Sequence, residues 1–354
     1  MREFEEALHS RERFGSAERL ALQARALWDR SAGRINEAAA ARRDLAQAAL
    51  HFYVPTDMVK VWLPLSEVPD VLPSRPRRPL RVLDVGSGWG AAALGAALFL
   101  ERSGFGGEVA LTLAESDAAR VRLSDAAFAA FRQASRLRFS VTRVGWTAPD
   151  VRDIEGGDRF DLVLGLDVAA RHLAPQEREA GCERLARGLL GLVGKRGAVV
   201  LLEPAVKANS RALSRVGCAL RSDGLVHAPC PAGRICPELE RSGFCFHSID
   251  VPLTPLTQSV AARCGLERHE ANFSYLTVVS GREDVPFDAD LPARVLSFPK
   301  RVGGGFHYHC CSAEGLTVGH ARRLLPDGQT RGGRLKHGTL VRLEAGTKEG
   351  TRGG

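Results

Sequence analysis

Strands and helices alternate along residues 80–222, and this alternation limits the fold more than any other feature of the sequence. Short apolar runs, typical of strands buried on both faces, are each followed by a longer segment of helical periodicity. Such units build a parallel sheet with helices on both faces, which binds ligands beyond the carboxyl ends of its strands. The expected strands are 80–85, 108–114, 139–144, 160–166 and 198–202, the last running into Glu203-Pro204, and the expected helices are 91–101, 117–132, 177–192 and 206–221.

The segments on either side of this core differ from it in pattern. Leu20, Ala24 and Leu27 form one of several helical stripes before residue 60, whereas the proline-rich stretch 73–79 suits a linker. A strand is expected at 273–279, and the glycine-richer remainder has short apolar runs. We therefore expect an N-terminal helical region over 1–72, an α/β Rossmann-like domain over 73–283 and a small C-terminal β extension over 284–354.

The first expected strand ends in a glycine-rich turn, Val82-Leu-Asp-Val-Gly-Ser-Gly-Trp-Gly90. Gly86, Gly88 and Gly90 allow the backbone to turn tightly and to approach a ligand without a clash from a Cβ atom. This D-x-G-x-G-x-G pattern resembles the first motif of class I S-adenosylmethionine-dependent methyltransferases. The resemblance implies that S-adenosylmethionine lies along the glycines.

Three carboxylates belong to the same expected site. The resemblance implies that Asp84 lies near the methionine end of the cofactor and that Glu115, after the second strand, binds the ribose hydroxyls. Asp167 follows the fourth strand, where it either faces the cofactor or caps the next helix. The glycines also match the dinucleotide pattern G-x-G-x-x-A. Asp84 would then repel the pyrophosphate, so we favour the methyltransferase interpretation.

The residues that would catalyse a reaction are not evident from the sequence. The fourth strand lacks the N/D-P-P-Y/F motif that many amino-methyltransferases use. Cys230 lies in a Pro-Cys-Pro sequence that is similar to the nucleophile motif of cytosine-C5 RNA methyltransferases. However, it follows the helix after the fifth strand rather than the fourth strand, which argues against that role. No catalytic residue is therefore predicted.

A loop over residues 224–250 contains three cysteines, Cys230, Cys236 and Cys245, between several prolines. Cysteine thiolates bind zinc or iron–sulfur clusters. The spacing C-x5-C-x8-C is wider than the C-x2-4-C of structural zinc sites and suits a bulkier cluster, with zinc as the alternative. The prolines would stiffen the loop. The sequence therefore predicts a metal site with three ligands from one loop.

A fourth ligand must come from elsewhere in the chain. Cys310 and Cys311 are the best candidates, and only one of them is expected to bind, because adjacent residues of a strand point to opposite faces. The weaker candidates are Cys264, His247 and His309, whereas Cys182 and Cys218 fall within expected helices.

The order of motifs around the cysteine loop carries a second resemblance. The loop, Ala-Pro-Cys-Pro…Cys-Pro…Phe-Cys-Phe-His, resembles that of the small-ribosomal-subunit Rsm-twenty-two family, Pro-Cys-Pro-His…Cys-Pro…Trp-Cys-His-Phe. Leu201-Leu-Glu-Pro204, Phe273-Ser-Tyr-Leu276 and Cys311-Ser-Ala-Glu-Gly315 follow the family's order. The resemblance, which spans about residues 55–315, implies association with small-subunit (16S-type) ribosomal RNA. It also implies a 4Fe–4S cluster on Cys230, Cys236, Cys245 and Cys311.

The charge of the chain suits a polyanionic partner. The formal net charge is +8 and the isoelectric point is about 9.3, and a basic surface gains affinity for RNA by releasing counterions. No segment approaches the ~20 apolar residues of a membrane span, and the N-terminus has no apolar signal core. We expect a bacterial cytoplasmic protein. The candidate phosphate contacts are Arg75–Arg78, Arg322, Arg323, Arg331, Arg334 and Lys336.

The sequence therefore predicts a methyltransferase-fold, iron–sulfur-binding protein that acts on or binds small-subunit ribosomal RNA in ribosome assembly or translation. The enzymatic interpretation, an S-adenosylmethionine-dependent rRNA methyltransferase, is favoured. One alternative is a non-catalytic assembly factor in which the cofactor and the cluster are structural. The other is a methyltransferase of a protein or a small molecule.

Overall fold

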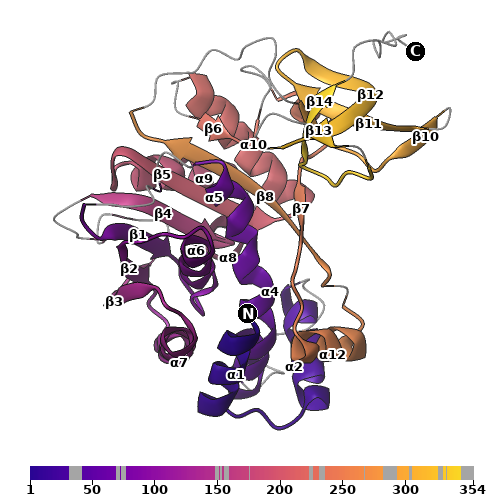
Figure 1. The fold of residues 1–354 in the computed structure, drawn as a ribbon. Helices are drawn as coiled ribbons and strands as arrows, with labels where there is room; N and C mark the ends of the chain where they lie inside the picture. Colours follow the sequence, from indigo (N-terminus) through magenta and orange to yellow (C-terminus); the bar gives the residue numbers. More distant parts are fainter. Residues whose placement is uncertain are drawn as a thin grey trace.

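The computed structural model describes most of the chain as two β-sheets and a layer of N-terminal helices (Figure 1). The first sheet has eight strands and the second has six. The described residues are 1–31, 42–68, 72, 77–147, 151, 154, 159–174, 176–222, 226–230, 236–266, 268–281, 293–302, 305–325, 330–331 and 333–343.

The first sheet has the strand order β3-β2-β1-β4-β5-β8-β6, with β7 paired to β8. Strands β1 to β5 are parallel, and β8 is inserted antiparallel between β5 and β6. A parallel sheet with its last long strand inserted antiparallel beside the fifth is the arrangement of class I methyltransferases, so the predicted Rossmann-like methyltransferase fold is confirmed. The strands are β1 (Leu80–Val85), β2 (Glu108–Ala114), β3 (Arg138–Val144), β4 (Phe160–Leu166), β5 (Val193–Pro204), β6 (Val226–Ala228), β7 (His247–Asp250) and β8 (Glu270–Val279).

Helices cover both faces of this sheet, which explains why its central strands carry apolar residues toward both sides. In β1, Leu80 and Val82 pack into one core, and Leu83 and Val85 pack into the other. The first core includes α6 (Ala91–Arg102) and α7 (Ala118–Ala134). The second includes α8 (Val168–His172), α9 (Arg178–Leu190) and α10 (Lys207–Ser222).

The N-terminal helices pack against the first core. The side chain of Phe4 meets Phe131 of α7 edge-on, with ring centroids 6.2 Å apart. A Cβ atom on Gly95 of α6 would lie 1.9 Å from the carbonyl oxygen of Met58, so glycine allows the two backbones to touch. The elements are α1 (Arg2–Arg11), α2 (Ala17–Ser31), α3 (Arg42–Ala48), the π-helix η2 (Ala49–Tyr53), α4 (Val54–Asp57), the 3-10 helix η3 (Met58–Val61) and α5 (Trp62–Ser66).

The second sheet is antiparallel and is formed by the C-terminal residues, drawn in orange to yellow in Figure 1. Its core contains Val295, Tyr308, Cys310, Leu335 and Val341. The strand order is β10-β11-β9-β14-β12-β13, with β11 also paired to β12. The strands are β9 (Ala293–Val295), β10 (Lys300–Val302), β11 (Gly305–Ser312), β12 (Gly315–Leu324), β13 (Thr330–Arg331) and β14 (Leu340–Leu343).

Several short elements were not predicted. Helix α12 (Pro255–Cys264), which packs against α2, begins with a capping box in which Thr254 and Thr257 bind each other's backbone N–H groups. The usual signature has Glu or Gln at the second position. Helix α11 (Pro237–Glu240) and strands β6, β7, β9, β10 and β13 are too short for a periodic signal.

The boundaries expected at 72/73 and 283/284 stay predictions. No helix of the described residues is long and apolar enough to cross a membrane.

Candidate functional site

The turn between β1 and α6 has the backbone conformation that its glycines predict. Gly86, Gly88 and Gly90 have φ angles of +61°, +54° and +85°, which other residues rarely adopt. A Cβ atom on Gly90 would also lie 2.7 Å from the ring of Phe128. The turn therefore requires glycine for both its conformation and its packing.

Asp84 lies beneath this turn rather than at its surface. Its Oδ2 accepts a 3.0 Å hydrogen bond from the backbone N–H of Ala93 in α6. Its Oδ1 is buried and has no hydrogen-bond partner in the described structure. Burial raises the pKa of Asp84 to about 7, against the opposing effects of the Ala93 N–H and of Arg171. Asp84 thus fixes the start of α6 and has one acceptor oxygen to spare.

Glu115 joins the end of β2 to the glycine turn. Its Oε2 accepts a 3.0 Å hydrogen bond from the N–H of Gly88, and its Oε1 accepts bonds from the N–H groups of Ser116 and Asp117. Arg120 lies 3.6 Å from Oε2. The structure therefore brings Asp84, Glu115 and the glycines together.

Trp146 and Arg171 also lie at this turn, and sequence reasoning missed both. A Cβ atom on Gly86 would be 3.1 Å from the Trp146 ring, and one on Gly88 would be 3.1 Å from Nη1 of Arg171. The Trp146 ring is buried and meets His172 edge-on, with centroids 5.3 Å apart. Trp146 directly follows the third strand of the sheet. Residues that follow the strands lie at the ligand-binding edge, so the sequence could have indicated this position.

Asp167 occupies the N-cap position of α8 in a left-handed conformation, with φ of +58°. Its side chain makes no capping hydrogen bond; Oδ2 instead lies 3.3 Å from Nη2 of Arg171, and Oδ1 is buried without a partner in the described structure. Asp167 is therefore oriented toward Arg171 beside the turn. Of the two roles expected for it, side-chain capping of the helix is wrong.

Glu203 at the end of β5 is a further buried carboxylate at this edge. It accepts hydrogen bonds of 2.7 and 2.9 Å from the N–H groups of Ala169 and Ala170, at the start of α8. Burial and the nearby Asp167 raise the pKa of Glu203 to about 8. Glu203 thus holds α8, and with it Arg171, against the end of the sheet.

The second candidate site lies where the cysteine loop meets the C-terminal sheet. Burial raises the pKa of the Cys245 thiol well above its usual value, and the neighbouring thiols of Cys230, Cys311 and Cys236 raise it further. Cys236 caps α11, and Cys311 lies on β11. The four predicted ligands are therefore near one another, although 65 residues lie between Cys245 and Cys311.

Cys310 points away from this group. It is fully buried in the core of the C-terminal sheet, where burial raises its pKa to about 12. Cys264 lies in the core between α2 and α12, and Cys182 in the second core of the first sheet. Among the residues that the structure describes, no group of three or more His, Cys, Asp or Glu side chains is arranged to hold a metal ion.

Arg294 of β9 is a buried cation beside the four cysteines. Its Nη2 lies 2.6 Å from Oε1 of Glu67, its Nη1 donates to the carbonyl of Gly338 at 3.0 Å, and its Nε donates to the carbonyl of Pro229. Glu67 also accepts a 2.5 Å hydrogen bond from the hydroxyl of Tyr275. Arg294 therefore joins the end of the N-terminal helices, the cysteine loop and the C-terminal sheet.

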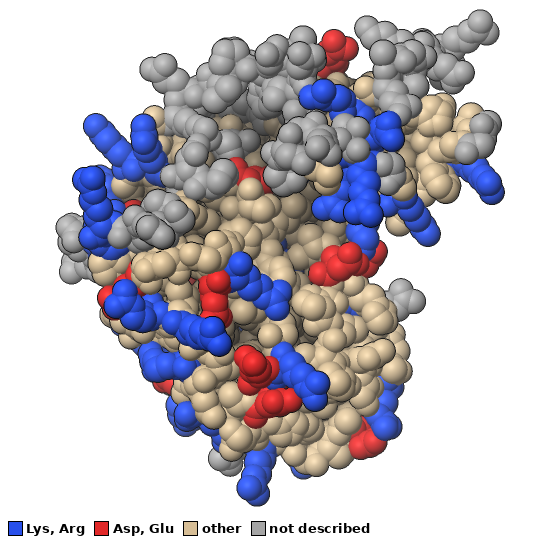
Figure 2. All heavy atoms as spheres, viewed as in Figure 1, with Lys and Arg blue, Asp and Glu red and all other residues tan. Residues whose placement is uncertain are grey.

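The expected phosphate contacts differ in their surroundings. Arg78 binds both oxygens of Asp161, at 2.8 and 2.6 Å, and Lys336 binds Asp250 and Glu270. Arg75 lies outside the described residues. Arg77 and Arg78 in the proline-rich stretch are exposed, as are Arg322, Arg323, Arg331 and Arg334 on the C-terminal sheet and its connecting loop. Figure 2 shows lysine and arginine side chains gathered over the C-terminal sheet.

Similar solved structures are methyltransferases at low identity. A putative class I S-adenosylmethionine-dependent methyltransferase from Listeria monocytogenes is 10% identical, with a TM-score of 0.41; the match covers 80% of this chain and 88% of that one. A precorrin-6y C5,15-methyltransferase from Geobacter metallireducens is 14% identical, with a TM-score of 0.36, covering 62% and 89%. At such scores the fold assignment rests on the strand order alone.

Sequence comparison identifies the family. No curated protein sequence matches this chain. The family model described as "Mitochondrial small ribosomal subunit Rsm22" matches residues 64–320, a range that includes the glycine turn, the cysteine loop and Cys311. The match covers most of the chain and agrees with the order of its motifs. The chain belongs to the Rsm22 family and has a methyltransferase fold.

Proposed function

We propose that this chain binds S-adenosylmethionine at the glycine turn, holds a 4Fe–4S cluster on four cysteines, and acts on or binds small-subunit ribosomal RNA. The observation that supports the proposal is that Cys311 lies opposite Arg294, which binds the carbonyl of Pro229 next to Cys230, while the thiols of Cys230, Cys236 and Cys311 raise the pKa of Cys245. The cluster connects the methyltransferase sheet to the C-terminal sheet, because Cys311 belongs to the latter.

The chemistry of the four thiols favours a metal centre. A buried thiol with a raised pKa keeps its proton unless a cation compensates the charge of the thiolate. The Cys245 thiol, near three other thiols and the buried Arg294, therefore suits iron that binds it as a thiolate. A cube of four irons takes one thiolate at each iron, whereas zinc draws all its ligands to about 2.3 Å of one ion.

The cofactor proposal rests on the turn and its carboxylates. Gly86, Gly88 and Gly90 hold the turn in left-handed conformations, Glu115 binds the N–H of Gly88, and Trp146 and Arg171 lie against the turn. Asp84 keeps one unsatisfied acceptor oxygen beneath the turn. When bound, S-adenosylmethionine supplies an electrophilic methyl group. The chain's own contribution is to fix the turn through Asp84 and Glu115, and to hold Arg171 beside it through Asp167 and Glu203.

The RNA proposal rests on the family and on charge. The family's name refers to the small ribosomal subunit, and the formal net charge of +8 suits a polyanion. That name also refers to mitochondria, so the expected bacterial cytoplasmic location stays a prediction.

Anaerobic purification of the chain tests the cluster. We expect about four irons per chain, a brown colour with broad visible absorption, and loss of both in a Cys245→Ser variant. Stoichiometric zinc without iron would replace the cluster by a zinc site. Copurification with small-subunit precursors tests the RNA association, and its absence would favour a methyltransferase of a protein or a small molecule.

One observation favours a non-catalytic assembly factor as the second candidate. The side chains of Trp146 and Arg171 lie over the glycines, within 3.1 Å of where Cβ atoms of Gly86 and Gly88 would be. A cofactor along the turn must displace them or stack on them. Transfer of a radiolabelled methyl group from S-adenosylmethionine to small-subunit RNA would reject this candidate. Cofactor binding without transfer to any substrate would support it.

A further inference from the structure

The C-terminal sheet has two chemically different faces, which its strand register defines. Directly paired residues of antiparallel strands point to the same face. Lys300 pairs with His307, and His307 pairs with His320. His309 pairs with Val318, and Arg322 pairs with Arg342. We name this the open face and define it by Lys300, His307, His309, Val318, His320, Arg322 and Arg342.

The open face is cationic and carries rings. Lys300, His309, Val318, Arg322 and Arg342 are exposed. Among its described residues, every charged side chain is a lysine or an arginine. The rings of His307 and His320 lie against each other, with their Nε2 atoms 3.0 Å apart. At its other end, the same face carries Cys311 and Arg294, which are buried against the cysteine loop.

The opposite face is the packing face. Tyr308, Cys310, Val295 and Val341 are fully buried there. At its margins, Arg301 pairs with Phe306, and Arg323 pairs with Arg331. The sequence thus places exposed cations in adjacent pairs, 300/301 and 322/323, whose members point to opposite faces.

We propose that the open face binds single-stranded ribosomal RNA. The inference rests on the proposed association with ribosomal RNA and names the surface and the form of RNA that it contacts. Lysine and arginine contact phosphates, while exposed imidazole rings stack on unpaired bases. A sheet that presents rings between cations is a common platform for single strands. A duplex hides its base faces and cannot use the rings, so the open face prefers single strands.

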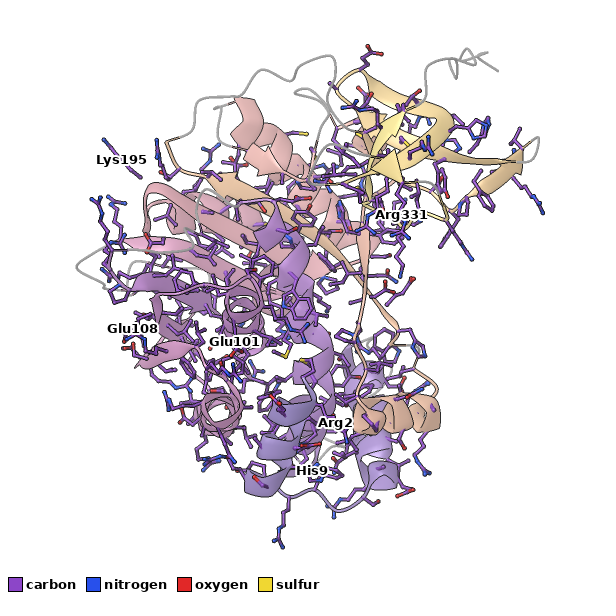
Figure 3. All side chains as sticks on the ribbon, in the orientation of Figure 1. Arg2, His9, Glu101, Glu108, Lys195 and Arg331 are labelled. Atoms are coloured by element: carbon purple, nitrogen blue, oxygen red, sulfur yellow. The ribbon has the colours of Figure 1, made fainter. Side chains whose placement is uncertain are left out.

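The adjacent cations give a matched test. The double variant Lys300→Glu/Arg322→Glu removes two cations from the open face. The double variant Arg301→Glu/Arg323→Glu makes the same charge change on the packing face of the same strands. Lys195→Glu, on the first sheet and far from Arg331 (Figure 3), reverses one charge outside the C-terminal sheet, which is half the charge change of each double variant. Binding is measured by fluorescence anisotropy with a labelled single-stranded segment of small-subunit RNA and with its duplex, at several salt concentrations.

We expect the open-face variant to bind the single strand at least about tenfold more weakly, with the salt slope reduced by about one for each phosphate that is no longer neutralised. The packing-face variant and Lys195→Glu should stay within about threefold of the parent chain. Replacement of His309 by alanine should weaken binding without changing the salt slope, because stacking releases no counterion.

Three results would overturn the proposal. Equal losses in the two double variants would show that only net charge matters. Equal affinity for duplex and single strand would exclude stacking on this face. If the parent chain binds neither RNA at low salt, both this inference and the proposed ribosomal RNA association fail. Thermal unfolding of each variant identifies any loss of binding that comes from misfolding. If the double variants misfold, the His309→Ala variant, changed at one exposed ring, decides whether this face binds the RNA.

Discussion

Cys311 of β11 lies directly opposite Arg294 of β9, and from there the guanidinium of Arg294 reaches the carboxylate of Glu67 at 2.6 Å. The pairing places a buried positive charge next to the thiols of the cysteine loop. The ion pair between Arg294 and Glu67 also connects segments that are 227 residues apart in the sequence. The cysteine site is therefore bounded by an ion pair as well as by sulfur atoms.

The first prediction concerns this ion pair. Arg294→Met should lower the free energy of unfolding by about 3–5 kcal/mol, because it leaves a buried carboxylate without its cation. The double variant Arg294→Met/Glu67→Met should recover part of the loss, since neither charge is then left alone. Chemical denaturation of the parent chain, both single variants and the double variant measures the coupling. Additive losses would contradict the prediction.

The second prediction concerns the cofactor turn. Gly88→Leu should abolish binding of S-adenosylmethionine in calorimetry, because a side chain would occupy the turn at a φ of +54°. Gly104 is a matched control: its φ is +73°, and a Cβ atom there would meet nothing within 4 Å. Both leucines carry a backbone cost of about 1–2 kcal/mol. Equal loss of binding in the two variants would mean that strain, rather than the site, is responsible. Tight binding of NAD in place of S-adenosylmethionine would reject the cofactor assignment.

The third prediction concerns the pH dependence of stability. The pKa of Asp84 is raised to about 7 in the folded chain, whereas an unfolded aspartate has a pKa of about 3.9. Between these values the folded chain binds the extra proton, so stability falls as the pH rises. Asp84→Asn keeps an acceptor for Ala93 and removes this loss.

The stabilisation by Asp84→Asn should therefore be larger at pH 8 than at pH 5, by on the order of 1–3 kcal/mol. The pKa of Glu203 is raised in the same direction. The stability of both the parent chain and the variant should therefore still fall somewhat as the pH rises. Urea denaturation at the two pH values provides the measurement. A stabilisation that does not change with pH would show that Asp84 is ionised throughout.

The fourth prediction separates two neighbouring cysteines. Cys311→Ala should remove the iron of the anaerobically purified chain and expose residues beyond 284 to proteolysis, because the proposed cluster binds the C-terminal sheet to the loop. Cys310→Ala should keep the iron, since Cys310 lies in the core on the other face. It should cost about 1 kcal/mol of stability through poorer packing. Iron analysis and limited trypsinolysis test both variants. Full iron in Cys311→Ala would assign the fourth ligand elsewhere.

The first sheet was predictable because its central strands, β1 and β4, are buried on both faces. The runs at 80–85, 108–114 and 160–166 are mostly apolar, and the observed strands have the same bounds. Helices that carry one apolar stripe, such as α10, were also predictable, to within a residue or two. Their signal is repeated over several turns, so single polar residues do not obscure it.

The two candidate sites were only partly predictable. Asp84, Glu115 and the four cysteines are in sequence motifs, whereas Arg171 and Glu67 take their roles from tertiary contacts across many residues. Nothing in the local sequence distinguishes Arg294 from the many exposed arginines. Only the strand register shows that it lies opposite Cys311. The lysines and arginines of the C-terminal sheet likewise divide between its two faces according to the strand register, which no local sequence pattern specifies.

The position of Cys311 late in the chain has a consequence during synthesis. Cys311 follows Cys245 by 66 residues. At 5–20 residues per second, a ribosome needs roughly 3–13 seconds to add them. For that time the nascent chain presents three thiols of the proposed centre without the fourth, open to oxidants and to competing metals. Delivery of iron and sulfur is therefore best timed after translation of the C-terminal sheet, and a chain truncated before residue 311 would start the site without completing it.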